Sequence, residues 1–180
     1  MSNLIPTLRY LWRTLAHKAF VFRAGLRLRV PLWQLLVHDW QKFLPWEAWA
    51  YGRHFFGDQS DPDGFARAWL HHQNSCPHHW EYWIPRTGHG AATGRNMDHL
   101  PLPMPERFVR EMVADWLGAA RGYQGSWPES LDRWTFYQRN KHRHRLAPET
   151  ALLLDQVLTE AFNGGSQSAR WRRALGLGAR

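Results

Sequence analysis

The 180-residue chain has a single cysteine, Cys76, and no apolar run long enough to cross a membrane. One cysteine excludes an internal disulfide and a zinc site built from several thiolates. Cys76 is then either one soft metal ligand or, as we favour, a small buried side chain. A bilayer span needs about 20 apolar residues, and the arginines scattered through the N-terminus are not typical of a signal peptide. We therefore expect a cytoplasmic protein without a membrane span.

Acidic residues are also missing from both ends of the chain. None occurs before Asp39, and the last fifteen residues contain four arginines and no acid. The whole chain has 23 Lys+Arg against 15 Asp+Glu, a formal net charge of +8. This balance favours a phosphate-bearing partner but does not choose between nucleotides, nucleic acid and lipid. A basic amphipathic first helix on a membrane surface is one alternative, and the same pattern also suits a helix packed on its own domain.

The hydrophobic periodicity is helical almost throughout, and no segment reads as a convincing strand. We expect an all-α fold, a single-domain helical bundle over residues 1–165 followed by a basic, flexible tail at 166–180. The predicted helices cover residues 4–24, 31–43, 45–56, 61–74, 105–120, 128–142 and 147–162. Between the fourth and fifth of these, residues 84–103 are rich in Gly, Pro and Asn. So long a loop is typical of a lid or binding segment.

Four predicted helices carry a titratable group in the middle of an apolar face, namely His17, Asp39, His72 and Asp115. Each alone has an ordinary explanation as a core residue with one hydrogen-bond partner. Together they require four separate partners, whereas one metal site serves them all. Imidazole and carboxylate suit Mn, Fe, Zn, Ni or Co. The sequence therefore predicts one or two divalent transition-metal ions, whose bound water ionises near neutral pH and attacks a phosphate.

The ordered set His17, His38-Asp39 and Asp115 resembles the H…HD…D signature of the HD-domain superfamily of metal-dependent phosphohydrolases, which are helical bundles. The resemblance implies that these four side chains bind the metal and that Asp39 bridges if two ions are present. "HDWQK" is similar to the superfamily's HD-x-x-K, which implies that Lys42 approaches the substrate phosphate. Gln41 departs from the pattern, since many HD enzymes have Gly or Ser there. Asp39 and Lys42 are then the expected catalytic residues.

Two pairs of histidines lie between the HD pair and Asp115 in "AWLHHQNSCPHHWEYW". They resemble the additional ligands of the two-metal HD enzymes, which implies one or more ligands of a second ion among His71, His72, His78 and His79. Helical periodicity favours His72 over His71. Pro77 can begin a new helix that aims His78 and His79 inward, where Glu81 would orient one of them.

A narrower resemblance covers roughly residues 15 to 155. Five segments match in order: "HKAFV", "HDWQKF", "AWLHHQNSCPHHWEYW", "MPERFVREMVADW" and "NKHRHRLAPET". They are similar to a family of small phage and bacterial proteins labelled as a domain of unknown function. A phage-encoded member would act in the host cytoplasm.

Aromatic and basic residues suggest the substrate. Trp80 and Trp83 directly follow the second histidine pair and offer a stacking wall for a nucleobase. Arg139 and Lys141 are either a cationic rim for phosphate or an ordinary solvated basic face. The expected substrate is a nucleotide: a nucleoside monophosphate, a cyclic nucleotide or a nucleotide second messenger.

Two other functions fit the same residues. The first is a nucleic-acid-binding protein, in which the basic N-terminal helix and tail contact phosphates and the histidines hold a structural zinc. The second is a non-catalytic nucleotide-binding module that keeps an HD-like pocket without turnover.

Overall fold

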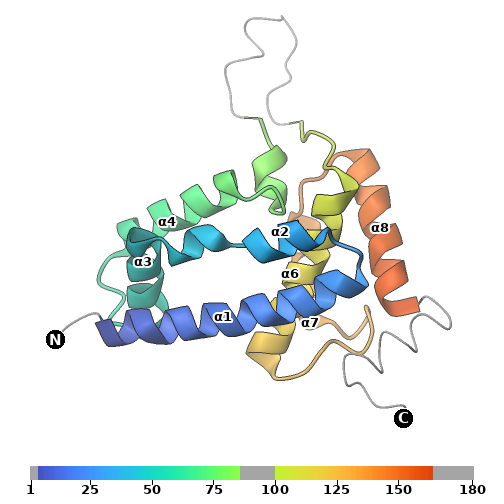
Figure 1. The fold of residues 1–180 in the computed structure, drawn as a ribbon. Helices are drawn as coiled ribbons and strands as arrows, with labels where there is room; N and C mark the ends of the chain where they lie inside the picture. The colour runs from blue at the N-terminus through green and yellow to red at the C-terminus, as the bar shows by residue number, and fades with distance from the viewer. Residues whose placement is uncertain (1–3, 86–99, 164–180) are drawn as a thin grey trace, which may run out of the picture.

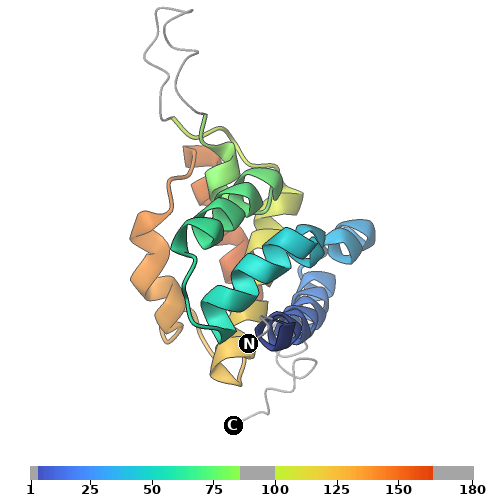
Figure 2. The same ribbon diagram turned by 90° about the vertical axis from the view of Figure 1, so that its left-hand side faces the viewer.

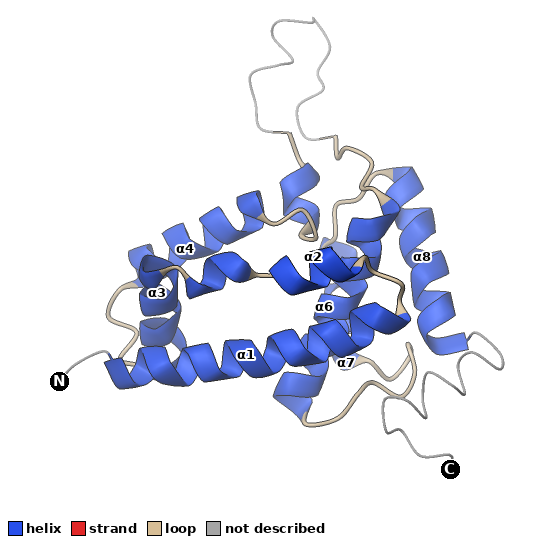
Figure 3. Ribbon diagram, viewed as in Figure 1, coloured by secondary structure: helices blue, strands red, loops and turns tan. Residues whose placement is uncertain are grey.

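The computed structural model describes residues 4–85 and 100–163, and within these ranges the chain forms α-helices, three short 3-10 helices and no strand (Figures 1 and 3). The all-α prediction is confirmed. The predicted tail and most of the predicted loop, residues 86–99, lie outside the described residues. The α-helices are α1 (Leu4–Arg27), α2 (Leu32–Val37), α3 (Pro45–Phe56), α4 (Pro62–Ser75), α6 (Glu106–Gln124), α7 (Thr135–Asn140) and α8 (Pro148–Asn163). The 3-10 helices are η1 (Trp40–Phe43), η2 (Trp80–Trp83) and η3 (Lys141–Arg143).

Helix α1 runs along one edge of the bundle and joins its two halves (Figure 1). Its N-terminal half packs against α3, where a Cβ on Gly52 would lie 2.7 Å from Cα of Thr7. Its C-terminal half packs against α6, where a Cβ on Gly118 would lie 2.6 Å from Cγ2 of Val21. Both crossings need a residue without a side chain, because the helices approach too closely for a larger one.

Two hydrophobic cores result from these contacts. The larger one joins α1, α6, α8 and the segment around Trp134, with Val21, Val113 and Leu117 fully buried. The smaller one joins α1, α3 and α4 around the stacked rings of Tyr10 and Tyr51. No helix in the described part of the chain is long and apolar enough to span a bilayer.

Four predicted helices have wrong boundaries, one of them being the helix expected over residues 105–120, which continues to Gln124 as α6. The helix expected over residues 31–43 stops at Val37, because His38 leaves the helical conformation, with ψ 127°, and Asp39 is left-handed, with φ 54° and ψ 26°. The first helix continues past Gly25 to Arg27, since Gly25 packs tightly against Leu35 within the core and does not cap the helix. The helix expected over 128–142 is confined to α7 and η3.

The close approach of α1 and α6 predicts a stability effect. Gly118→Ala should lower the free energy of unfolding by about 1–3 kcal/mol, because the new Cβ would overlap Val21 within a packed core. Gly122→Ala is the matched control in the same helix. There the nearest atom to the new Cβ, on Phe20, is 3.9 Å away, so the higher helix propensity of alanine should stabilise the protein by up to about 1 kcal/mol. Urea denaturation of both variants measures the difference, and equal stabilisation of the two would contradict the packing described here.

Candidate metal centre

Titratable side chains from five separate segments meet between α1, α4 and α6. Within this set, His38, Asp39, His72 and His78 are each at most 3% exposed. Burial of so many ionisable groups is unusual unless they are paired or bind a cation. The contributors are His17 from α1, His38 and Asp39 from the link between α2 and η1, His72 from α4, His78 and His79 from the turn before η2, and Asp115 from α6.

The link that carries His38 and Asp39 has a specific local structure. Asp39 adopts the left-handed conformation, and its side chain and that of His38 are both buried, whereas the following Trp40 is exposed. Aspartate is one of the non-glycine residues that reach this conformation most easily. The ammonium of Lys18 donates hydrogen bonds to the carbonyl oxygens of Leu36, at 2.9 Å, and His38, at 2.5 Å. α1 therefore holds the link in place. Lys18 was not singled out from the sequence.

The first group of potential ligands consists of His17, His38, Asp39 and Asp115, with one ligand atom of each within 4.8 Å of the others. Nε2 of His17 lies 2.8 Å from Oδ1 of Asp115. Nε2 of His38 lies 3.5 Å from Oδ2 of Asp39 and 3.5 Å from Oδ1 of Asp115. The four residues that match the HD-like pattern are thus brought together.

The second group consists of Asp39, His72, His78 and His79, again with ligand atoms within 4.8 Å of one another. Oδ1 of Asp39 is 3.4 Å from Nε2 of His72 and 3.3 Å from Nε2 of His78. Nε2 of His79 lies 3.0 Å from Nε2 of His72. Both histidines of the second pair belong to the group, whereas only His72 of the first pair does.

Asp39 is shared by the two groups in a particular way. Its Oδ2 faces His38, and its Oδ1 faces His72 and His78. One carboxylate therefore presents a separate oxygen to each group. This arrangement suits a carboxylate that bridges two cations.

Glu111 is a buried participant that the sequence reasoning missed. Its Oε1 accepts a hydrogen bond from Nδ1 of His38 at 2.8 Å and lies 3.5 Å from Nδ1 of His78. The other oxygen, Oε2, accepts from the side-chain amide of Gln34. The carboxylate thus stands behind two imidazoles and directs Nε2 of each toward Asp39. Its position one helical turn before Asp115 was an available signal.

Burial and charge separate the protonation states of the site. Burial lowers the pKa of His38, but the charge of Asp39 and the nearby carboxylates of Asp115 and Glu111 outweigh it and raise that pKa to about 10. Burial lowers the pKa of His72 to about 2 and of His79 to about 3. Burial also opposes ionisation of Asp39 and Asp115, yet the facing histidines hold the pKa of both carboxyls well below the usual range. Ionised carboxylates and neutral imidazoles are the forms that bind metal ions, so Asp39, Asp115, His72 and His79 are in that form near neutral pH, whereas His38 would have to release a proton.

Several buried polar atoms of the centre make no hydrogen bond. They include Nε2 of His38, Oδ1 of Asp39 and Nε2 of His78, which are also the atoms directed toward the shared region. An unpaired buried polar atom costs roughly 1–3 kcal/mol. Nitrogen and oxygen donors in this arrangement fit divalent transition-metal ions, which would give these atoms the partners that they lack. The residues present therefore fit such an ion.

Two residues near the histidines lie outside these groups. Nδ1 of His71 lies 2.5 Å from the buried carboxylate of Glu47, and the side chain is 43% exposed. Sγ of Cys76 lies 3.4 Å from Nδ1 of His72, on the ring edge away from Asp39. Cys76 therefore contacts the back of a potential ligand and is a buried side chain, as favoured above. Oε2 of Glu81 is 3.9 Å from Nδ1 of His79.

The residues expected to contact substrate have different surroundings. The ammonium of Lys42 lies 2.6 Å from Oδ2 of Asp39, beside both groups. Trp80 and Trp83 are partly buried against the larger core, and the indole N–H of Trp83 donates to the carbonyl oxygen of Pro77 at 2.8 Å. Arg139 and Lys141 are exposed in α7 and η3, as expected for a solvated basic face.

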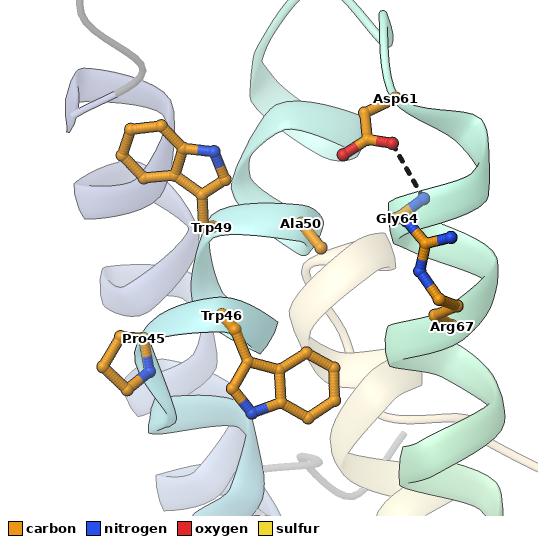
Figure 4. A pocket seen from close by; sticks show the side chains of 7 residues that line it. All are labelled: Pro45, Trp46, Trp49, Ala50, Asp61, Gly64 and Arg67. Atoms are coloured by element: carbon orange, nitrogen blue, oxygen red, sulfur yellow. Dashed lines mark hydrogen bonds between the residues drawn. The ribbon is translucent and has the colours of Figure 1, made fainter.

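A separate hollow of about 500 Å³ lies between α3 and α4 (Figure 4). Trp46 and Trp49 line it from α3, and Arg67 lines it from α4. No residue of the two ligand groups borders it. The hollow is therefore distinct from the candidate metal centre.

Comparison with known proteins shows the family. A family model described as "Family of unknown function (DUF5662)" matches residues 7–160. The match covers most of the chain, including every residue of the two ligand groups, so the chain belongs to this family. Neither the curated proteins nor the solved structures contain a match.

Proposed function

We propose that this protein is a metal-dependent phosphohydrolase that acts on a nucleotide. The observation that carries the proposal is the shared carboxylate of Asp39, whose two oxygens face two sets of potential ligands. A divalent cation in such a site lowers the pKa of bound water toward neutrality and stabilises the negative charge that develops on a phosphate. The HD-like order His17, His38-Asp39, Asp115 supports the same assignment.

In this proposal the protein residues have separate roles. His17, His38 and Asp115 would hold one cation, and His72, His78 and His79 would hold the other, with Asp39 available to both. Lys42 places a positive charge beside the shared carboxylate and would bind a non-reacting phosphate oxygen. The side chains of His17 and Asp115 are 19% and 16% exposed, whereas those of His38 and His72 are fully buried. Substrate would therefore approach past His17 and Asp115.

The first test combines metal analysis with a turnover assay. Purified protein loaded with Mn, Ni, Co or Zn should retain up to two equivalents of metal after desalting. The loaded protein should release phosphate, or open the phosphodiester, from members of a panel of nucleoside monophosphates, cyclic nucleotides and second messengers. Lys42→Ala should lower kcat/KM by about 10- to 100-fold while the metal content stays unchanged, because Lys42 acts on the substrate.

The outcomes separate this proposal from the two alternatives. Absence of any retained metal would refute it. Metal and nucleotide binding without turnover would support the non-catalytic module. Two results together would support the nucleic-acid-binding protein with a structural zinc. The protein would bind nucleic acid with an affinity that falls steeply as salt is raised, and replacement of Asp39 would unfold the protein instead of only abolishing turnover.

A further inference from the structure

An exposed apolar stripe runs along the whole of α1. At 100° per residue its members fall within an arc of about 100°. Each is at least half exposed, and Trp12 reaches 75%. The helix has 24 residues, so the stripe is about 36 Å long. Its members are Leu4, Ile5, Leu8, Trp12, Leu15 and Leu26.

Helix α2 extends this surface. Four of its six residues, Leu32, Trp33, Leu36 and Val37, are 50–60% exposed, and Trp40 in η1 is 54% exposed. α1 and α2 lie on the same side of the molecule in two perpendicular views (Figures 1 and 2). Single exposed apolar side chains are ordinary, but a continuous apolar surface marks an interaction site. We call these exposed side chains of α1, α2 and η1 the α1–α2 face.

The exposed charges that α1, α2 and η1 themselves carry have one sign. Arg9, Arg13 and Arg29 are exposed beside it. The first two acids of the chain, Asp39 and Glu47, are 2% and 0% exposed. Among the described residues, the first exposed acid along the chain is Asp58. Within residues 4–43 the exposed tryptophans and leucines are therefore accompanied by exposed cations alone, while the exposed acid Glu106 of α6 lies at the edge of the face, paired with Arg110.

Exposed apolar side chains combined with exposed cations favour one kind of partner over the others. A second copy of the chain would bring two basic faces together, and their like charges would repel. Nucleic acid would match the arginines but would leave the leucines and tryptophans without an apolar contact. An anionic bilayer matches both features, since apolar side chains enter the acyl boundary, tryptophan prefers the interface and arginine pairs with lipid phosphates.

We propose that the α1–α2 face binds the surface of an anionic lipid bilayer. Leu8, Trp12, Leu15 and Trp33 insert to the depth of the headgroup boundary, and Arg9 and Arg13 contact anionic headgroups. Binding is peripheral, with α1 lying in the plane of the interface. This property is independent of the metal centre, to which α1 contributes only His17, on the other side of the helix.

The experiment is sedimentation of the full-length protein with vesicles of phosphatidylcholine alone, or of phosphatidylcholine mixed with phosphatidylglycerol. Binding should require the anionic lipid and weaken as salt is raised. Trp12→Glu combined with Trp33→Glu should lower the partition coefficient by at least about 10-fold, because both rings leave the interface and two negative charges are added. Leu152→Glu is the matched control, since Leu152 is 67% exposed on α8 and should bind as the unaltered chain does.

Three results would overturn the assignment. Equal binding to neutral and anionic vesicles would remove the role of charge. Undiminished binding by the double variant would place any lipid contact elsewhere in the chain. A concentration-dependent dimer in light scattering that Leu15→Glu dissociates would show that the occupant is a second copy. Without vesicles, nucleotide turnover by the Trp12→Glu/Trp33→Glu variant and by Leu152→Glu should equal that of the unaltered protein. Failure of this inference therefore leaves the proposed activity unaffected.

Discussion

Replacement of Asp39 by asparagine should abolish turnover and reduce the retained metal to less than one equivalent. The amide keeps the shape of the side chain but removes the negative charge that both ligand groups share. We expect kcat/KM to fall by at least about 10³-fold, which corresponds to roughly 4 kcal/mol of transition-state stabilisation. Elemental analysis and phosphate release on the same preparation measure both effects.

Asparagine is also the replacement that best preserves the fold. The φ of Asp39 is 54°, and asparagine tolerates the left-handed conformation as well as aspartate does. Helical content and melting temperature of the variant should therefore stay near those of the unaltered protein. Asp132→Asn is a suitable control, because Asp132 is exposed and outside both groups. An Asp39→Asn protein that retains two equivalents of metal would end the bridging assignment.

Glu111→Gln should weaken metal binding by about 10- to 100-fold without removing a ligand. Glu111 accepts from His38 through one oxygen and from Gln34 through the other. A glutamine can accept on one side only, and its amide would face a second donor on the other side. The imidazole of His38 would lose both its orientation and the adjacent negative charge. Competitive titration with Co²⁺, at a temperature well below the melting temperature of the variant, measures the metal affinity.

Two further variants distinguish positioning from simple structural support. Glu106→Gln, on the exposed start of α6, should leave metal affinity unchanged. Gln34→Glu combined with Glu111→Gln keeps one carboxylate hydrogen-bonded to one amide within the same buried pair. This exchange should recover the stability lost in Glu111→Gln but not the metal affinity, since the charge has moved away from His38. Recovery of both would mean that Glu111 is only a packing residue.

Local patterns predicted the helices and most of the candidate ligands. The 3.6-residue period of apolar side chains is a local property, and the all-α fold follows from it. His17, Asp39, His72 and Asp115 attracted attention because a charged group on an apolar face needs a partner. The prediction that Asp39 is buried is correct, but the reason for it is partly wrong. A continuous helix over residues 31–43 would place Asp39 on an apolar face beside Leu32. Leu32 is 56% exposed, and Asp39 is buried at a left-handed turn instead of on such a face.

Periodicity was less informative where two neighbouring candidates compete. His71 and His72 differ by 100° around α4, which is enough to send one to Glu47 and the other to Asp39. His78 and His79 both reach the same group because they lie in a turn rather than in a regular helix. Glu111 has no signature of its own, since its role depends on Gln34 and His38, which are more than 70 residues away in the sequence.

The sequence by itself determined that this chain is helical, basic at its N-terminus and supplied with more buried titratable groups than an ordinary core accepts. Only the tertiary structure decided that Asp39 belongs to two groups, that Glu111 stands behind two of the histidines and that the apolar stripe of α1 remains exposed. The physical reason is that apolar residues occur on two faces of α1, and periodicity identifies such faces without saying which one another helix covers. Gly52 of α3 and Gly118 of α6 let these helices pack closely against one face of α1, and that face becomes the buried one. Both glycines are far from α1 in the sequence.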